Sequence, residues 1–389
     1  MKTERLHLRD SALLEFTADI IEHQPSPRGV WVRLDCTAFY AESGGQPCDT
    51  GDIAGVPVLQ VQLLQGEPWH ELPQLPARQQ GVLCRVDARR RLDHMQQHLG
   101  QHMLSAVLYA RGAATVGFHL GQREVTVDLD RQLSAGELAL AEGEVNRIIW
   151  ENRPVRVRFP DAAELAAMRL RSLPEVAEDI RIIEVEGLDL CPCGGTHPDA
   201  TGVVGSLLLL GSERHKGGLR VRFVCGGRAL AHAQALQTMA ARLSAALSVA
   251  AEDLAPKVEA LQQDHRMLKK DRDDLKAAVL QAEAAALAAQ ADPHRVLGRV
   301  LDGKGFDDAR ALAQNLAALG ITALLAVQEG PQARVALASP GASGRDMGAL
   351  LRLTTAALGG RGGGSPTAAQ GMFPGAAQPV LDALLAELG

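Results

Sequence analysis

Hydrophobic and polar residues alternate along the first part of the chain, in short runs separated by glycine and proline. Residues 30–34 and 56–63 are two such runs, and this alternation is typical of strands with one face against a core. The pattern predicts that residues 1–88 form a small β-barrel or curled sheet.

Residues 89–230 combine helical and strand patterns. The segment 94–111 is expected to be a helix, with Asp93 as its N-cap and Gly112 as its stop. The other elements expected here are a helix over 135–151 and strands over 124–129, 155–159 and 220–224. Such a mixture predicts an α+β domain.

Residues 231–291 are rich in alanine, leucine, glutamate, glutamine and lysine. Leucines recur every seven residues, at Leu247, Leu254, Leu261, Leu268 and Leu275. This spacing is typical of a long helix or coiled coil. The intervening positions are too polar for a tight parallel zipper, and Pro256 is expected to kink or break the helix. An intrachain helical hairpin and a dimer seam are both compatible with the pattern.

Residues 292–389 are predicted to form a compact α/β module. Their pattern gives a strand, a helix, a strand, a hairpin, a helix, a glycine-rich loop and a final helix. The loop, residues 359–371, is either a flexible connection or a backbone nest that, with Arg361, approaches a phosphate. A homodimer, if formed, is expected to use residues 231–389.

Composition limits the class of protein. The chain has 389 residues, 46% of them hydrophobic, which is enough to bury a sizeable core in two to three domains. Six irregularly spaced cysteines and a charged N-terminus predict a reduced, cytoplasmic protein without an export signal or membrane span. A net charge of −6 excludes a protein that coats nucleic acid by charge alone, so any RNA contact must be local.

Two pairs of potential metal ligands carry the clearest chemistry. His98 and His102 are four residues apart on the expected helix, so both imidazoles point the same way. Cys193 and His197 are also four apart, and the glycines between them allow a tight turn. Together the pairs can form one zinc site. Cys191 offers a second thiolate, and only its spacing from His197 favours Cys193.

A protease function and RNA binding are two further hypotheses for the ligand pairs and their flanking residues. A zinc protease requires a glutamate directly after the first histidine as its general base, whereas this chain has Leu99. Cationic residues flank both ligand pairs and could contact RNA phosphates; they are Arg89, Arg90, Arg91, Lys216 and Arg220. The alternative for each cationic cluster is ordinary solvated surface.

Several motifs resemble the trans-acting alanyl-tRNA editing proteins, the AlaX family, which is similar to the editing domain of alanyl-tRNA synthetase. The two ligand pairs match its His-x3-His and Cys-x3-His motifs. Residues 37–51, TAFYAESGGQPCDTG, resemble its glycine-rich N-terminal signature, and residues 116–121 resemble another stretch. Residues 359–371 resemble the glycine-rich loop of the synthetase's C-terminal domain, C-Ala, so the likeness is to a long form and covers nearly the whole chain.

The resemblance implies four domains and a site. The domains are a glycine-motif β-barrel domain (1–88), a zinc-binding editing domain (89–230), a helical coiled-coil segment (231–291) and a C-Ala-like domain (292–389). One Zn²⁺ per chain is implied, bound by His98, His102, Cys193 and His197. The substrate-binding residues implied are Gly44, Gly45, Gln46, Gly194, Gly195 and Thr196, with Gln46 positioning substrate or water.

The implied reaction is hydrolysis of the ester that joins serine, or glycine, to tRNA(Ala), with a zinc-associated water as the nucleophile. A synthetase pocket shaped for alanine cannot strongly exclude either amino acid, so a second hydrolytic site is required. One residue departs from the family pattern: Leu99 replaces a threonine that helps to select serine. The alternative function is a non-catalytic tRNA-binding or oligomerisation protein with a structural zinc.

Overall fold

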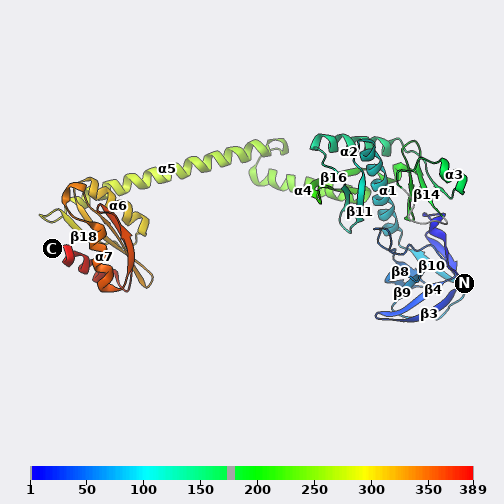
Figure 1. Ribbon diagram of the computed structural model, residues 1–389, viewed down its shortest axis with the longest axis horizontal. Helices are drawn as coiled ribbons and strands as arrows, with labels where there is room; N and C mark the ends of the chain where they lie inside the picture. The colour runs from blue at the N-terminus through cyan, green and yellow to red at the C-terminus, as the bar shows by residue number, and fades with distance from the viewer. Residues whose placement is uncertain (1, 173–179, 389) are drawn as a thin grey trace. The chain divides into compact units, whose positions relative to one another are not determined.

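The computed structural model describes residues 2–172 and 180–388 (Figure 1). They form two compact units, Met1–Arg242 and Leu243–Gly389. The fold is mixed α and β in both units, which confirms the predicted α+β class. Each unit is described separately.

The N-terminal part of the first unit contains two four-stranded sheets. One has the order β2 (Glu15–Ala18), β10 (Val82–Val86), β6 (Gly51–Ile53) and β7 (Val56–Val58). The other has the order β3 (Ile20–Ser26), β4 (Gly29–Leu34), β9 (Glu67–Leu72) and β8 (Gln60–Leu64). A short parallel pair, β1 (Glu4–Arg5) with β5 (Cys36–Thr37), and a 3-10 turn (Leu6–Leu8) complete this region.

The predicted β-barrel is wrong, because no closed barrel forms within residues 2–172 and 180–388. The chain passes from one sheet to the other at Asp19 and Leu59, and apolar residues of both sheets share one core. The strands β6 and β7 are only three residues long. The edge strand β7 therefore offers few hydrogen bonds for closing a barrel, and the sheets pack against each other instead.

The rest of the first unit holds the helix that carries His98 and His102. That helix, α1 (Ala88–Ala110), and α2 (Ala135–Trp150) pack on an antiparallel sheet (Figure 1). The sheet has the order β11 (Thr115–Leu120), β12 (Val125–Leu129), β17 (Gly218–Cys225) and β16 (Leu207–His215). A second sheet joins β13 (Val155–Arg158), β14 (Ile182–Val185) and β15 (Asp189–Pro192), and α3 (Ala162–Ala167) and a 3-10 turn (Thr201–Val204) lie in the connections.

The start of α1 differs from the prediction. Asp87, not Asp93, is the N-cap, and its carboxylate accepts hydrogen bonds from the backbone N–H groups of Arg89 and Arg90. Asp93 lies inside the helix and accepts hydrogen bonds from Arg228 instead. The first N–H groups of a helix have no partner within the helix, and an aspartate cap satisfies them. Asp87 directly precedes Ala88, the first helical residue, so its carboxylate is the one placed to accept from them.

Helices dominate the start of the second unit. Helix α4 (Gly226–Leu247) runs across the boundary between the units, and α5 (Leu254–Ala288) follows a 3-10 turn (Ala251–Asp253). The break lies before Pro256, which occupies the first turn of α5, where a missing N–H costs little. Leu268 and Leu275 are 67% and 68% exposed, so pairing of the leucine stripe remains a prediction. The end of α5 packs on α6 through Ala284 and Leu287.

A five-stranded sheet forms the centre of the second unit. Its order is β18 (Val296–Val300), β19 (Thr322–Glu329), β20 (Gln332–Ala338), β22 (Ala368–Pro374) and β21 (Arg361–Gly364), with only the first pair parallel. Helix α6 (Phe306–Ala318) and the end of α5 cover one face, and α7 (Met347–Leu358) and α8 (Ala377–Leu388) cover the other.

The glycine-rich segment is a β-hairpin rather than the predicted loop. Residues 361–364 form the edge strand β21 and pair with β22. A Cβ atom at Gly362 would lie 2.4 Å from the Gln370 carbonyl oxygen and 2.9 Å from Leu351 Cδ2. Glycine here permits close packing of β21 against β22 and α7, and an extended strand is not the nest conformation. RNA contact by Arg361 remains a prediction.

Candidate metal centre

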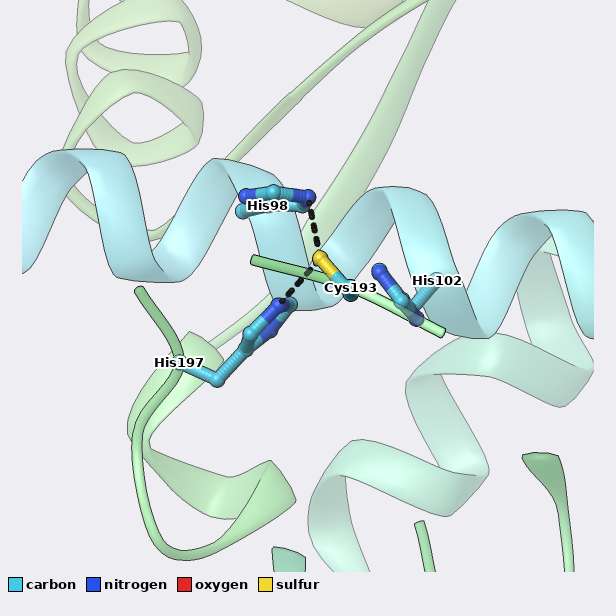
Figure 2. Close-up of side chains that lie close together, drawn as sticks. All are labelled: His98, His102, Cys193 and His197. Atoms are coloured by element: carbon cyan, nitrogen blue, oxygen red, sulfur yellow. Dashed lines mark hydrogen bonds between the residues drawn. The ribbon is translucent and has the colours of Figure 1, made fainter. Parts of the chain in front are cut away.

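The four predicted ligands lie together in the first unit. His98 and His102 project from successive turns of α1, while Cys193 and His197 come from the turn that follows β15 (Figure 2). The Cys193 sulfur lies 3.4 Å from His98 Nε2 and 3.3 Å from His197 Nε2. One potential ligand atom from each residue falls within 4.8 Å of the others, and the three imidazoles are buried.

This donor set fits a zinc ion. A tetrahedral zinc with Zn–S near 2.3 Å and Zn–N near 2.0–2.1 Å places sulfur and nitrogen about 3.5 Å apart. The two sulfur–nitrogen distances, 3.4 Å and 3.3 Å, correspond to edges of such a tetrahedron. A buried cluster of three imidazoles and one thiol suits zinc, whereas magnesium and calcium prefer oxygen ligands.

The structure separates Cys191 from Cys193. Cys191 lies within β15, on the same face as Asp189, and its sulfur is 3.4 Å from the Ser172 hydroxyl. Cys193 follows the end of the strand and faces the three histidines (Figure 2). Residues two apart on a strand share a face, so alternation alone would not separate the two thiols; Cys193 lies beyond the end of β15, in the turn that leads to His197. Cys193 is the cysteine that completes the cluster of four.

Hydrogen bonds from Gln46 hold one side of the cluster. His98 Nδ1 donates to Gln46 Oε1 at 2.7 Å, and Gln46 Nε2 donates to Thr196 Oγ1 at 2.9 Å. The Thr196 backbone N–H also donates to Oε1, at 3.1 Å. Gln46 is completely buried, which excludes a turn residue facing water. Its contacts orient His98, and a role in positioning substrate or water stays a prediction.

Burial and neighbouring charges shift the pKa values of the cluster. Burial raises the pKa of Cys193, but the positive charges of His98, His197 and His102 outweigh it, so this pKa lies well below its ordinary value. Burial lowers the pKa of His102, but the Cys193 thiolate and Asp189 raise it to about 10. Burial is the main cause of the lowered pKa of His197. The cluster thus favours a thiolate, the form of cysteine that binds metals.

Arg181 ties the metal turn to the N-terminal segment. Its Nη1 donates to the carbonyl oxygens of Cys193 and Gly195, at 2.6 and 2.9 Å, and its Nε donates to the Leu8 carbonyl at 2.8 Å. Ser11 accepts a hydrogen bond from the His197 backbone N–H. These contacts join segments more than 170 positions apart in sequence, so they could not be found from local patterns.

A cavity of about 1740 Å³ opens beside the ligands. Its lining includes three ligands, the glycines Gly44 and Gly194, the aromatic residues Phe118 and Phe159, and the cations Lys2, Arg5, Arg9, Arg171 and Arg181. Of the six implied substrate-binding residues, Gly45, Gln46, Gly195 and Thr196 are not in the described lining. Leu99 is fully buried within the apolar core of this domain and is likewise absent from the described lining.

The predicted RNA-binding cations have different surroundings. Arg91 has no exposed surface, and it donates to the Asp49 carboxylate and to the carbonyl oxygens of Ser11 and Ala38. The prediction that Arg91 contacts RNA is therefore wrong, because its guanidinium is buried and pairs with the Asp49 carboxylate. Arg220 pairs with Asp128. RNA contact by Arg89, Arg90 and Lys216 remains a prediction.

Sequence reasoning missed the cations that line the cavity. Lys2, Arg5 and Arg9 lie close to the start of the chain, far in sequence from both ligand pairs, and Arg171 and Arg181 stand apart from any charge run. Folding alone brings them to the cavity.

Among helices of the described residues, none is long and apolar enough to cross a membrane.

Comparisons with known proteins relate this chain first to a domain of tRNA synthetases and then to a protein family. Residues 180–222 match the family model for the second additional domain of threonyl and alanyl tRNA synthetases. The rat alanyl-tRNA editing protein Aarsd1 (Rattus norvegicus) is 33% identical over 288 residues, which are 69% of this chain and 69% of that protein. The chain belongs to the family of alanyl-tRNA editing proteins.

Two archaeal relatives extend the comparison. The alanyl-tRNA editing protein AlaX-L of Pyrococcus horikoshii is 34% identical over 238 residues, 58% of this chain and 59% of that protein. The alanine–tRNA ligase of Pyrococcus abyssi is 30% identical over 393 residues, which are 95% of this chain but only 42% of the ligase. The chain therefore corresponds to less than half the length of that ligase.

Proposed function

We propose that this protein is a trans-editing aminoacyl-tRNA deacylase that hydrolyses seryl-tRNA(Ala) and, as a second substrate, glycyl-tRNA(Ala). The observation that carries the proposal is the position of the metal-ligand cluster at a cavity lined by cations. The family relationship to alanyl-tRNA editing proteins supports the substrate class.

The cavity lining suits the 3′ end of a tRNA. Lys2 and Arg9 are exposed, and no carboxylate partner is found for either among the described residues, so both are available to phosphates. Phe159 is 51% exposed and can stack on a base, as aromatic residues do in single-stranded RNA sites. The Phe118 ring lies 5.7 Å from the His98 ring, which makes this wall of the cavity apolar close to the ligands.

His98, His102, Cys193 and His197 would hold the ion, and a bound zinc would supply Lewis acidity and a water of lowered pKa. The protein's own residues shape and orient the site. Gln46 and Thr196 fix His98, while Arg181 holds the metal turn through two carbonyl oxygens. Cys193 faces the three histidines, so we assign it the role of ligand rather than nucleophile.

Leu99 does not shape the proposed pocket, since it is buried in the apolar core. Its replacement of the family's threonine therefore leaves serine selection to groups that line the cavity. A pocket that hydrogen-bonds the serine hydroxyl would disfavour alanine and glycine alike, because the site's polar groups would be left unpaired; glycyl-tRNA(Ala) is therefore placed second to seryl-tRNA(Ala). We expect alanyl-tRNA(Ala) to be spared.

The test is hydrolysis of seryl-, glycyl- and alanyl-tRNA(Ala) by the full chain, with and without metal, after circular dichroism has shown that both samples are folded. Loss of serine but not alanine, dependent on metal, is the expected result. Retained zinc without release of any amino acid would instead support the non-catalytic tRNA-binding protein, whose four protein ligands would close a structural site.

A further inference from the structure

A buried carboxylate stands behind one of the four ligands. His102 Nδ1 lies 3.3 Å from Asp189 Oδ2. A carboxylate only accepts hydrogen bonds, so His102 carries a proton on Nδ1, and Nε2 is the ring nitrogen left to bind a metal. The side chains of His102 and Asp189 are 3% and 2% exposed, which protects this contact from competition by water.

The carboxylate is itself held from the other side. Arg171 Nε donates to Asp189 Oδ1 at 2.8 Å, and Arg171 Nη2 donates to Oδ2 at 3.0 Å. This two-point contact fixes the plane of the carboxylate as well as its charge. The result is a chain from Arg171 through Asp189 to His102 that ends at the metal-ligand cluster.

The same residues could be read as a second metal site, because His102, Asp189 and Cys191 also form a close group. Both Asp189 oxygens, however, already accept hydrogen bonds from the Arg171 guanidinium. A second cation there would have to displace Arg171 and compete for His102 Nδ1. The contacts favour a carboxylate that orients a ligand over one that binds an ion directly.

The three histidines are supported unequally. His98 donates to the neutral amide of Gln46, and His102 donates to an anionic carboxylate. His197 Nδ1 has no hydrogen-bond partner among the described residues. An anionic acceptor makes an imidazole a stronger donor to a metal than a neutral acceptor does, so His102 has the strongest support of the three.

We propose that Asp189, held by Arg171, is a positioning residue that fixes the tautomer and ring orientation of His102 and thereby raises metal affinity. The inference rests on the metal centre of the proposed function, but it concerns binding of the ion rather than hydrolysis. Removing such an outer contact typically weakens metal binding about 10–100-fold.

The experiment measures zinc affinity of the full-length protein by competition with a chromophoric chelator. We expect Asp189→Ala to bind zinc about 10–100-fold more weakly, and Asp189→Asn to lose less, because its amide oxygen still accepts from His102. Asp128→Ala is the matched control. Asp128 also accepts a two-point contact from an arginine, Arg220, but it lies on β12 and does not contact a ligand.

Arg171→Gln gives a second variant that leaves the His102–Asp189 contact in place, and a smaller loss of affinity is expected. If Asp189→Ala does not fold, Asp189→Asn and Arg171→Gln decide the question. Wild-type affinity in the folded Asp189 variants, an equal loss in Asp128→Ala, or no zinc binding by the native protein would each overturn the inference. Zinc binding with the expected losses but without tRNA hydrolysis would refute the deacylase alone.

Discussion

Gly195 is the position where one added methyl group should disable the metal centre. A Cβ atom there would lie 2.2 Å from His98 Cε1, 2.4 Å from His98 Nδ1 and 2.8 Å from Gln46 Oε1. Ordinary contacts begin near 3.4 Å, so the imidazole would have to retreat by about 1.2 Å. Metal–ligand distances tolerate only about 0.2 Å, and the displaced ring would also lose its hydrogen bond to Gln46.

We expect Gly195→Ala to weaken zinc binding at least about 10–100-fold, the range seen when ligand support is lost. Crowding of the buried turn should also lower the free energy of unfolding by about 1–3 kcal/mol. Zinc affinity can be measured by chelator competition, and hydrolysis of seryl-tRNA(Ala) should fall with occupancy at limiting zinc.

Gly194→Ala is the control for this experiment. Gly194 is the preceding residue in the chain, and a Cβ atom built on it meets no atom within 4 Å. Its zinc affinity should match the wild type within about twofold. Wild-type zinc affinity in Gly195→Ala, or an equal loss in Gly194→Ala, would refute the argument that zinc binding requires the close approach of the Gly195 backbone to His98.

Three further predictions concern the cavity, the core and the buried arginine. Phe159→Ala should lower kcat/KM for seryl-tRNA about 5–150-fold, the equivalent of one lost base stack of about 1–3 kcal/mol, whereas Trp150→Ala, exposed but outside the described lining, should leave it unchanged; equal effects would exclude stacking. Leu99→Thr should reduce the free energy of unfolding by about 2–4 kcal/mol through a cavity and a buried hydroxyl, without changing the ratio of serine to alanine release; a changed ratio in folded protein would place residue 99 at the pocket. Arg91→Ala should cost about 3–5 kcal/mol in urea unfolding by leaving Asp49 buried and unpaired, and a cost below about 1 kcal/mol would contradict this.

The proximity of the side chains within each predicted ligand pair could be anticipated from sequence, because each pair is local. Helical spacing alone places His98 beside His102, and a short glycine turn alone brings Cys193 near His197. The strands within residues 89–230 were predictable for the same reason, since alternation depends on neighbouring residues. β12, predicted over 124–129, runs from Val125 to Leu129.

The errors arose where the outcome depends on distant parts of the chain. Closure of a barrel depends on which edge strands meet, and no local pattern encodes that choice. Arg91 belongs to a run of three arginines, a pattern typical of an exposed surface. It is buried nevertheless, because Asp49 and two carbonyl groups accept hydrogen bonds from it in the fold. Asp189 could not be linked to His102 for the same reason, since 87 positions separate them.

The assembly of the cluster from two distant segments sets a time scale for its completion. Cys193 follows His98 by 95 positions, and ribosomes add about 5–20 residues per second. Roughly 5–20 s therefore pass between synthesis of the helical pair and synthesis of the turn. During that interval only two of the four ligands exist, and two imidazoles bind zinc more weakly than a full tetrahedral set. A nascent chain should thus acquire its ion late, when the new turn docks against a helix already made.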